Sequence, residues 1–168
     1  NESLQVSIAA AKSIMNVLNE RNEKNQGKKV LSNIKGDIEI KNLSFQYGDK
    51  GRNVLNQISL KIKRGEKIAL VGKSGGGKTT LMNLLPRFYD FQEGDILIDK
   101  VNIKELKLDN LRSFFSLVTQ DTILFNDSVR NNICYGNQTK KISDLRLNEV
   151  IEQSNCREFI EKLPNKLD

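Results

Sequence analysis

The sequence has few cysteines, no histidine and no apolar run long enough to span a membrane. Cys134 and Cys156 are too few to cross-link a fold and lack metal-binding spacing, so we interpret them as reduced thiols of a cytosolic protein. Because a signal peptide is missing as well, we expect this segment to be soluble and not to cross a membrane. Its 168 residues suit one domain large enough to form a core.

The chain also lacks a concentrated region of one charge. Its net charge of +6 comes from scattered basic residues, and adjacent lysines occur only at Lys28-Lys29 and Lys140-Lys141. This distribution indicates a solvated basic surface and predicts no nucleic-acid partner.

Residues 72–79 fit the pattern G-x-x-x-x-G-K-[ST], in which glycines let backbone N–H groups point at a phosphate. An apolar run at 66–71 predicts a buried strand before the loop, and a helix over 78–88 follows, whose N-terminus adds partial positive charge. We expect Lys78 to reach the β- and γ-phosphates and the Thr79 hydroxyl to bind Mg²⁺. A chance glycine-rich turn is the alternative, but the flanking pattern favours a nucleoside triphosphate site.

Alternating apolar residues predict strands at 38–45 and 58–62, which form an antiparallel pair around the loop at 48–53. Further strands are expected at 94–99 and 115–119. The predicted fold therefore combines these strands with helices, which are predicted from apolar residues at helical spacing.

A helix is predicted over residues 3–20, with an apolar stripe that buries one face against a partner element. Residues 21–35 are polar and indicate a linker, and Pro86 is expected to distort or end the helix over 78–88 early. The run Asn126-Asp127-Ser128 gives a cap-like start to a helix, and Ser143 or Asp144 can cap another. Short helices are expected at 109–112, 126–133, 143–154 and 157–163.

Several motifs occur in a fixed order beside the phosphate loop. They lie at 42–47, 55–66, 87–90, 94–99, 110–112, 118–120, 124–129 and 132–133. With them, residues 36–168 resemble the nucleotide-binding domain of ABC transporters, specifically exporters of lipids, drugs or peptides. The resemblance implies an α/β P-loop cassette in which an antiparallel β subdomain lies beside a parallel core sheet, with a helical subdomain beginning near residue 128.

The resemblance also implies roles for single residues. Tyr47 takes the place of the aromatic that stacks on adenine, so we expect its hydroxyl to matter little for binding. The alternative is a strand-end tyrosine with one edge in water. Gln120 takes the place of the glutamine near Mg²⁺ and the attacking water, so Lys78 and Gln120 are the candidate catalytic residues and Thr79 and Gln120 the metal ligands; a surface glutamine is the alternative. The implied nucleotide-binding residues are Tyr47, Gly72, Ser74, Gly75, Gly76, Gly77, Lys78, Thr79 and Thr80, the last at the α-phosphate.

Three elements of this family have no counterpart in the sequence: the Leu-Ser-Gly-Gly-Gln signature, the acidic end of the Walker B strand, and the switch histidine. We therefore expect a cassette truncated before these motifs, with 36–168 as its N-terminal part and 1–35 as the end of the last transmembrane-domain helix and a linker. Alone, it is expected to be inactive. Lys100 replaces a glycine common in exporters, which leaves the turn type there open.

The parent protein is expected to use ATP and Mg²⁺ to export a lipid, drug or peptide from the cytoplasmic face of a membrane. Its expected partners are a second nucleotide-binding domain, in a homo- or heterodimer, and the coupling helices of a transmembrane domain, which dock through residues 121–129. One alternative is the ATPase head of a DNA-repair or chromosome-maintenance protein, although 71 residues precede Gly72 and no heptads follow. Another is a non-hydrolysing regulatory ATP-binding cassette.

Overall fold

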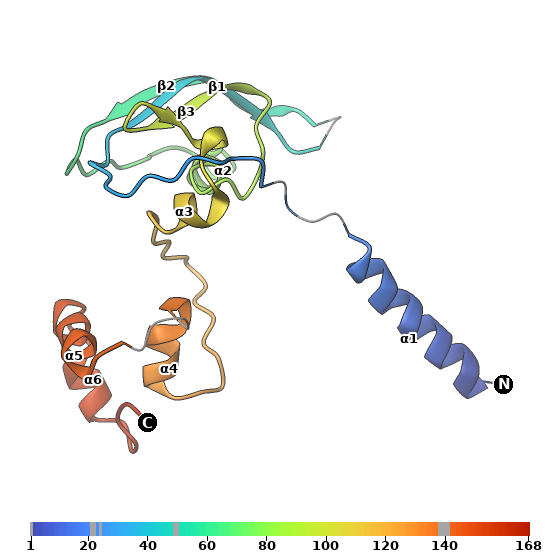
Figure 1. The fold of residues 1–168 in the computed structure, drawn as a ribbon, viewed down its shortest axis with the longest axis vertical. Coiled ribbons are helices and arrows are strands. Elements are labelled where there is room, and N and C mark those ends of the chain that lie inside the picture. Colours follow the sequence, from blue (N-terminus) through green and yellow to red (C-terminus); the bar gives the residue numbers. More distant parts are fainter. Residues whose placement is uncertain (1, 21–22, 24, 49–50, 138–141) are drawn as a thin grey trace. The chain divides into compact units, whose positions relative to one another are not determined.

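The computed structural model describes residues 2–20, 23, 25–48, 51–137 and 142–168, which form two compact units, Asn1–Ser116 and Leu117–Asp168 (Figure 1). The boundary predicted at residue 35 separates a linker from the nucleotide-binding part and not these two units, so it stays a prediction. The lysine pair at 140–141 and part of the loop at 48–53 lie outside the described residues. Among the described helices, none is long and apolar enough to cross a membrane.

The first unit is built on a four-stranded antiparallel sheet. Its strands are β1 (Ile38–Gln46), β2 (Asn53–Ile62), β3 (Glu93–Ile98) and β4 (Val101–Asn102), in the order β2-β1-β3-β4. The strands predicted at 38–45, 58–62 and 94–99 are thereby confirmed, including the antiparallel pairing of the first two. These strands form because alternating apolar side chains on neighbouring strands meet on one face, as Ile40 does with its partners Leu60 and Ile96.

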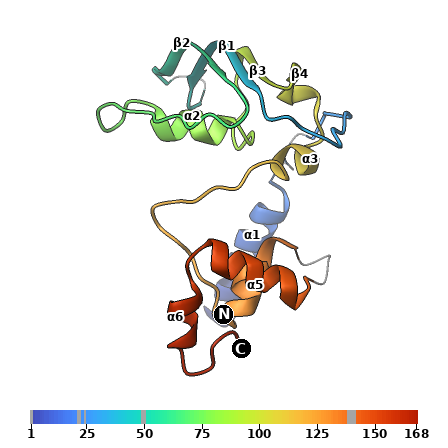
Figure 2. The ribbon, with the colours of Figure 1, turned by 90° about the vertical axis from the view of Figure 1, so that its left-hand side faces the viewer.

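Helix α2 (Lys78–Leu84) lies against one face of this sheet (Figures 1 and 2). It buries Thr80, Leu81 and Leu84, and the two leucines join the apolar core of the sheet. The helix ends two residues before Pro86, whose ring cannot continue it, so the predicted early end is confirmed. The buried apolar core consists of Ile40, Leu43, Phe45, Leu55, Leu81, Leu84, Leu85, Phe91, Ile96, Ile98, Ile103, Leu106 and Leu111.

Two segments predicted as buried strands are not strands. Residues 66–71 and 115–119 have no ladder partner among the described residues. Most of their apolar side chains are exposed, with Val71 90% and Val118 92% exposed, whereas Phe115 packs partly buried against the core. A strand needs at least one neighbouring strand to pair its backbone groups, and parallel strands are usually covered on both faces as well. The antiparallel part of the predicted fold forms here, whereas the parallel core sheet does not.

Helix α1 (Glu2–Leu18) confirms the helix predicted over 3–20, but its described side chains, from residue 5 onward, are exposed. The side chain of Leu4 lies outside the described set. The expectation that the stripe buries one face was therefore wrong for the described residues, because helical periodicity shows that a face is apolar and not what covers it.

The linker predicted at 21–35 is not a free tether. Where it is described, it runs along the 3₁₀ helix η1 (Ile103–Glu105) and helix α3 (Leu108–Arg112), as the bridge between Lys29 and Leu106 shows. Helix α3 confirms the helix predicted at 109–112.

The turn between β3 and β4 resolves the question raised by Lys100. Asp99 has φ 48° and Lys100 φ 70°, so both adopt the left-handed conformation of the tight hairpin turn in which glycine is common. The Asp99 carboxylate accepts hydrogen bonds from the backbone N–H groups of Lys35 (2.6 Å), Gly36 (3.2 Å) and Asp37 (3.0 Å). The side chain of the turn therefore binds the segment that enters β1.

The second unit is helical and has a small core of its own. Ser128 caps α4 (Val129–Cys134) by accepting from the Asn131 N–H (3.2 Å), so the cap lies within the predicted run 126–128. Ser143 caps α5 (Asp144–Gln153) by accepting from the Arg146 N–H (3.3 Å), which selects Ser143 over Asp144. The core residues are Leu147, Ile151 and Ile160. The helices are α4 (Val129–Cys134), η2 (Tyr135–Asn137), α5 (Asp144–Gln153) and α6 (Arg157–Glu161).

We predict that Asp99 contributes stability that is lost in acid. Burial by itself raises the pKa of this carboxyl group, but the backbone N–H groups of Lys35, Asp37 and Gly36 outweigh it and the pKa lies below its usual value. A lowered folded-state pKa gives stability that is present above the unfolded-state value, about 4, and is lost as the pH falls toward the folded value. Urea unfolding of Asp99→Asn from pH 3 to 7 should show lower stability at neutral pH and a flatter acid limb.

Asp121→Asn removes an exposed carboxylate for which the structure shows no hydrogen bond, and it serves as the control. If both variants keep the acid limb of the unsubstituted chain, Asp99 does not hold the turn as described.

Candidate functional site

The phosphate loop is shaped by glycines that cannot be replaced freely. Gly77 caps α2 with φ 82°, and a Cβ there would lie 2.8 Å from Leu55 Cδ2 and 3.0 Å from Val54 O. Gly75 has φ 76°, which a side chain also disfavours. A Cβ on Gly76 would lie 3.0 Å from Lys73 O. The loop therefore turns tightly against β2, with its backbone rather than side chains on the inside.

Lys78, the first residue of α2, turns its side chain back over this loop. Its ammonium group donates to the carbonyl oxygens of Gly72 (2.9 Å) and Lys73 (2.8 Å). Thr79 and Ser74 are exposed beside it. A fixed positive charge, glycine backbone and an open hydroxyl are the groups that a polyphosphate and its Mg²⁺ require, so these residues fit such a ligand.

Tyr47 directly follows β1 and is joined to α2. Its hydroxyl lies 3.0 Å from Thr80 Oγ1, and the Tyr47 side chain is 43% exposed. The hydroxyl of Tyr47 therefore has a partner that the sequence did not indicate, because it forms a hydrogen bond with the buried Thr80. Since Thr80 bonds to Tyr47 here, its predicted role at the α-phosphate stays a prediction.

A second tyrosine, to which the sequence analysis gave no role, belongs to the same group. Tyr89 packs edge-on against Tyr47 with ring centroids 5.1 Å apart. Phe45, in β1, also packs edge-on against Tyr47, with ring centroids 4.9 Å apart. Such edge-to-face pairs fix the plane of the Tyr47 ring. The motif at 87–90 was the available signal for Tyr89, but nothing in its spacing placed it beside residue 47.

Gln120 belongs to the second unit, where it is exposed at a bend followed by Asp121, whose carbonyl accepts from Thr119 Oγ1 (2.7 Å). The first unit brings together Tyr47, Thr80 and the phosphate loop. The structure does not join Gln120 to them, and its place near the metal stays a prediction. No cluster of three His, Cys, Asp or Glu residues that could hold a metal occurs in the described part of the chain.

The predicted docking segment, 121–129, is an ordered apolar loop in the second unit. Ile123 is 82% and Leu124 75% exposed, and Phe125 stacks on Tyr135 with ring centroids 4.2 Å apart. The amide of Asn132 accepts from the Phe125 N–H (2.8 Å) and donates to the carbonyls of Phe125 (3.1 Å), Asp127 (3.2 Å) and Ser128 (2.9 Å). The sequence does not indicate this role of Asn132, because an asparagine amide can bond to several neighbouring backbone groups and sequence spacing does not show which.

Comparisons with known proteins agree with this geometry. The family described as "ABC transporter" matches residues 55–167. The ATP-dependent lipid A-core flippase of Pseudoalteromonas translucida is 46% identical over 169 residues, and that of Escherichia coli (strain K12) is 39% identical over 168 residues. Both alignments include 100% of this chain but only 29% of the relative, so the chain spans less than a third of these proteins.

A solved structure is also similar over nearly the whole chain. It is that of a bacterial Atm1-family ABC exporter with ATP bound, which is 29% identical with a TM-score of 0.81 and covers 99% of this chain and 29% of the exporter chain.

We predict that Tyr47 contributes to nucleotide affinity through both its ring and its hydroxyl. Tyr47→Ala removes a base–aromatic stack of about 1–3 kcal/mol, and Tyr47→Phe removes a hydrogen bond of about 0.5–1.5 kcal/mol. Titration with a fluorescent ATP analogue should therefore rank affinity as unsubstituted, then Phe, then Ala.

Tyr89→Phe is the matched control, since the structure shows no hydrogen bond to the Tyr89 hydroxyl, and its affinity should be unchanged. If Tyr47→Ala binds as well as Tyr47→Phe, the ring does not carry base affinity.

Proposed function

This chain belongs to the ABC transporter family, and on that premise we propose that it binds ATP at residues 72–80 and powers export in the protein that carries it. The predicted family and the α/β cassette fold are confirmed, although the described residues form no parallel core sheet. ATP binding follows from membership in this family. The observation that carries the site assignment is the Lys78 ammonium, held over the phosphate loop by the carbonyls of Gly72 and Lys73.

Each end of the nucleotide has a place in this proposal. The polyphosphate binds at the glycine backbone and Lys78, where charge-assisted hydrogen bonds are strong. The adenine stacks on the exposed ring of Tyr47, whose orientation is supported by Thr80 and Tyr89. The distances within this group support simultaneous contact, because Thr80 follows Lys78 by two residues on α2 and is bonded to Tyr47.

Magnesium and the chemical step form a further part of the proposal. Mg²⁺ prefers oxygen ligands and commonly takes several of them from phosphates and water, so the exposed Thr79 hydroxyl can serve without an acidic cluster. Gln120 supplies a second neutral oxygen and orients the attacking water. In phosphoryl transfer, positioning and charge stabilisation carry most of the catalysis, which suits Lys78 and Gln120 as the catalytic residues of this chain.

The transported substrate is proposed to be a lipid. Two relatives are named ATP-dependent lipid A-core flippases, and the solved neighbour is an ABC exporter. None of these names indicates DNA repair, which favours export over the DNA-repair alternative. We place the chain at the cytoplasmic face of a membrane, in a protein in which two cassettes pair around ATP.

The partner that receives the mechanical output is proposed to be a transmembrane domain, which docks on residues 121–129. The exposed Ile123 and Leu124 form an apolar surface, and Asn132 fixes the loop beneath it through four hydrogen bonds. A rigid loop loses less conformational entropy on docking than a free one, so this clamp favours the interaction.

We predict that Lys78→Ala in the whole parent protein abolishes ATP-driven lipid flipping in reconstituted vesicles. Losing a charge-assisted contact of about 1.5–3 kcal/mol should weaken ATP binding roughly tenfold or more. Lys73→Ala removes an equal charge from the same loop but from a side chain for which the structure shows no contact, and it should keep affinity and flipping. Unchanged ATP affinity in Lys78→Ala would overturn the site, and ATP binding without hydrolysis in the unsubstituted protein would support the regulatory alternative.

We predict that Leu124→Asp separates hydrolysis from transport. A charge in an apolar docking surface is costly to desolvate, so flipping should fall while the ATPase rate persists. Leu145→Asp, at an equally exposed position in the same unit, is the control and should transport normally. Equal transport by the two variants would count against docking at 121–129.

A further inference from the structure

A polar segment of the first unit is fastened to the fold at many points. We call Glu23 and residues 25–31 the strap. The N–H groups of Lys28 (3.0 Å) and Lys29 (2.9 Å) both donate to Glu105 O, and the Lys107 N–H donates to Lys29 O (2.9 Å). Lys29 and Glu105 also form an ion pair. The strap therefore follows η1 through backbone hydrogen bonds rather than crossing it loosely.

Side-chain amides extend this attachment to α3. Asn25 Oδ1 accepts from the Leu108 N–H at the start of the helix (3.2 Å). Asn110 accepts from the Leu31 N–H (2.8 Å) and donates to Leu31 O (3.1 Å). Gly27 is packed so closely that a Cβ would lie 1.9 Å from Leu106 O. A segment held by this many bonds moves with α3, not independently.

Arg112, at the end of α3, joins the strap to the far end of α2. Its Nη1 donates to Glu23 Oε2 (2.7 Å), and its Nη2 forms an ion pair with Glu23 Oε1. The same guanidinium donates from Nε to Pro86 O (3.2 Å) and from Nη2 to Arg87 O (3.1 Å), and it lies over the Phe88 ring at 5.4 Å. Pro86 and Arg87 lie two and three residues beyond the end of α2, the helix that begins at the phosphate-loop lysine.

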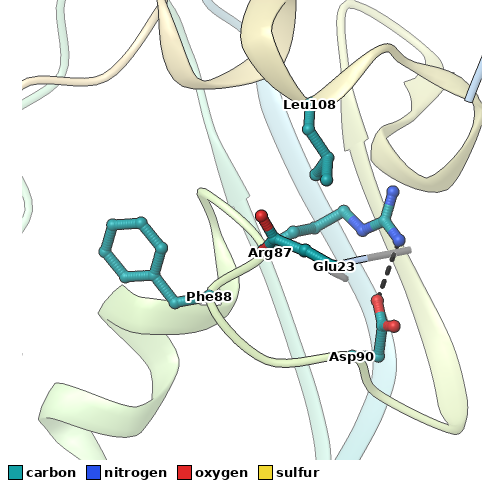
Figure 3. A pocket seen from close by; sticks show the side chains of 5 residues that line it. All are labelled: Glu23, Arg87, Phe88, Asp90 and Leu108. Atoms are coloured by element: carbon teal, nitrogen blue, oxygen red, sulfur yellow. Dashed lines mark hydrogen bonds and ion pairs between the residues drawn. The ribbon is translucent and has the colours of Figure 1, made fainter. Parts of the chain in front are cut away.

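A cavity of about 200 Å³ beside this contact gives the turn room to shift. Figure 3 shows the five residues around it, with the Arg87 guanidinium turned toward Asp90. Arg87 is 7% exposed, and its Nη2 bonds to Asp90 (2.8 Å), whereas Nε and Nη1 have no partner in the described part of the structure. Unpaired buried donors are unfavourable, so a small displacement of this turn would change the hydrogen bonds that the Arg87 guanidinium forms.

We propose that Arg112 is a positioning residue that ties the end of the phosphate-loop helix to Glu23, so that nucleotide bound at residues 72–80 fixes the strap leading back to α1. The inference rests on the proposed nucleotide binding. The hydrogen bond from Arg112 also holds the pKa of the Glu23 carboxyl group below its usual value, against burial, so the pair stays ionised at neutral pH. The path from ligand to strap consists of one helix, one turn and one ion pair.

Hydrogen exchange of the strap in the whole parent protein tests this path. Exchange of the backbone amides of residues 28–31 is followed by mass spectrometry with and without a non-hydrolysable ATP analogue and Mg²⁺. In the unsubstituted protein, saturating analogue should slow exchange roughly fivefold or more, the lower range of typical coupling between sites. Glu23→Ala should lose this response, and Arg112→Lys, which keeps the charge but not the forked contact, should reduce it.

Glu20→Ala is the matched control, because it removes an acidic side chain three residues away for which the structure shows no ion pair, and its response should be full. A merely structural role for Glu23 predicts faster exchange with an unchanged ratio between bound and free protein. That result, or an unchanged strap in unsubstituted protein that binds the analogue, would overturn the inference while leaving nucleotide binding intact. Failure of the unsubstituted protein to bind a fluorescent ATP analogue would instead refute the proposed function.

Discussion

Helix α2 buries Leu81 and Leu84 in the core that it shares with the antiparallel sheet, and both of its ends are fixed by this packing. Burial of a leucine side chain contributes roughly 1.5–3 kcal/mol, so the helix cannot slide without a large cost. At its start, Gly77 contacts Leu55 and Val54 of β2. At its end, the turn at Pro86 lies under Arg112. The phosphate loop, the tyrosine beside it and the strap all depend on this one contact.

The chemistry of the chain is distributed over two units with different tasks. The first unit holds the groups that we propose as nucleotide contacts, with Lys78 over the loop and Tyr47 fixed by Thr80. The second carries Gln120 and the apolar loop that Asn132 clamps. In the function we propose, a triphosphate binds at the first set, whereas hydrolysis and mechanical output use groups from both sets.

The contrast between the two kinds of sheet has a physical cause. Antiparallel neighbours can be joined by a short hairpin, as β1 and β2 are within residues 38–62, and β1 also pairs with β3 at residues 93–98. A parallel strand needs a neighbour brought from far along the chain. Residues 66–71 and 116–119 form no strand in the described chain and stay exposed despite their apolar residues. The same local pattern gives a strand or an open segment according to what lies beside it.

The sequence alone determined the phosphate loop, the antiparallel strands, most of the helices and the family, because glycine spacing, alternation and capping residues act over a few positions. Tertiary structure decided the rest. No local pattern showed that the hydroxyl of Tyr47 meets Thr80 or that Tyr89 packs beside Tyr47. The pairing of Glu23 with Arg112, 89 positions further along the chain, had no local signal either. Nor did periodicity show that the face of α1 lies open. These are contacts between residues distant in sequence, and only the folded chain brings such residues within reach.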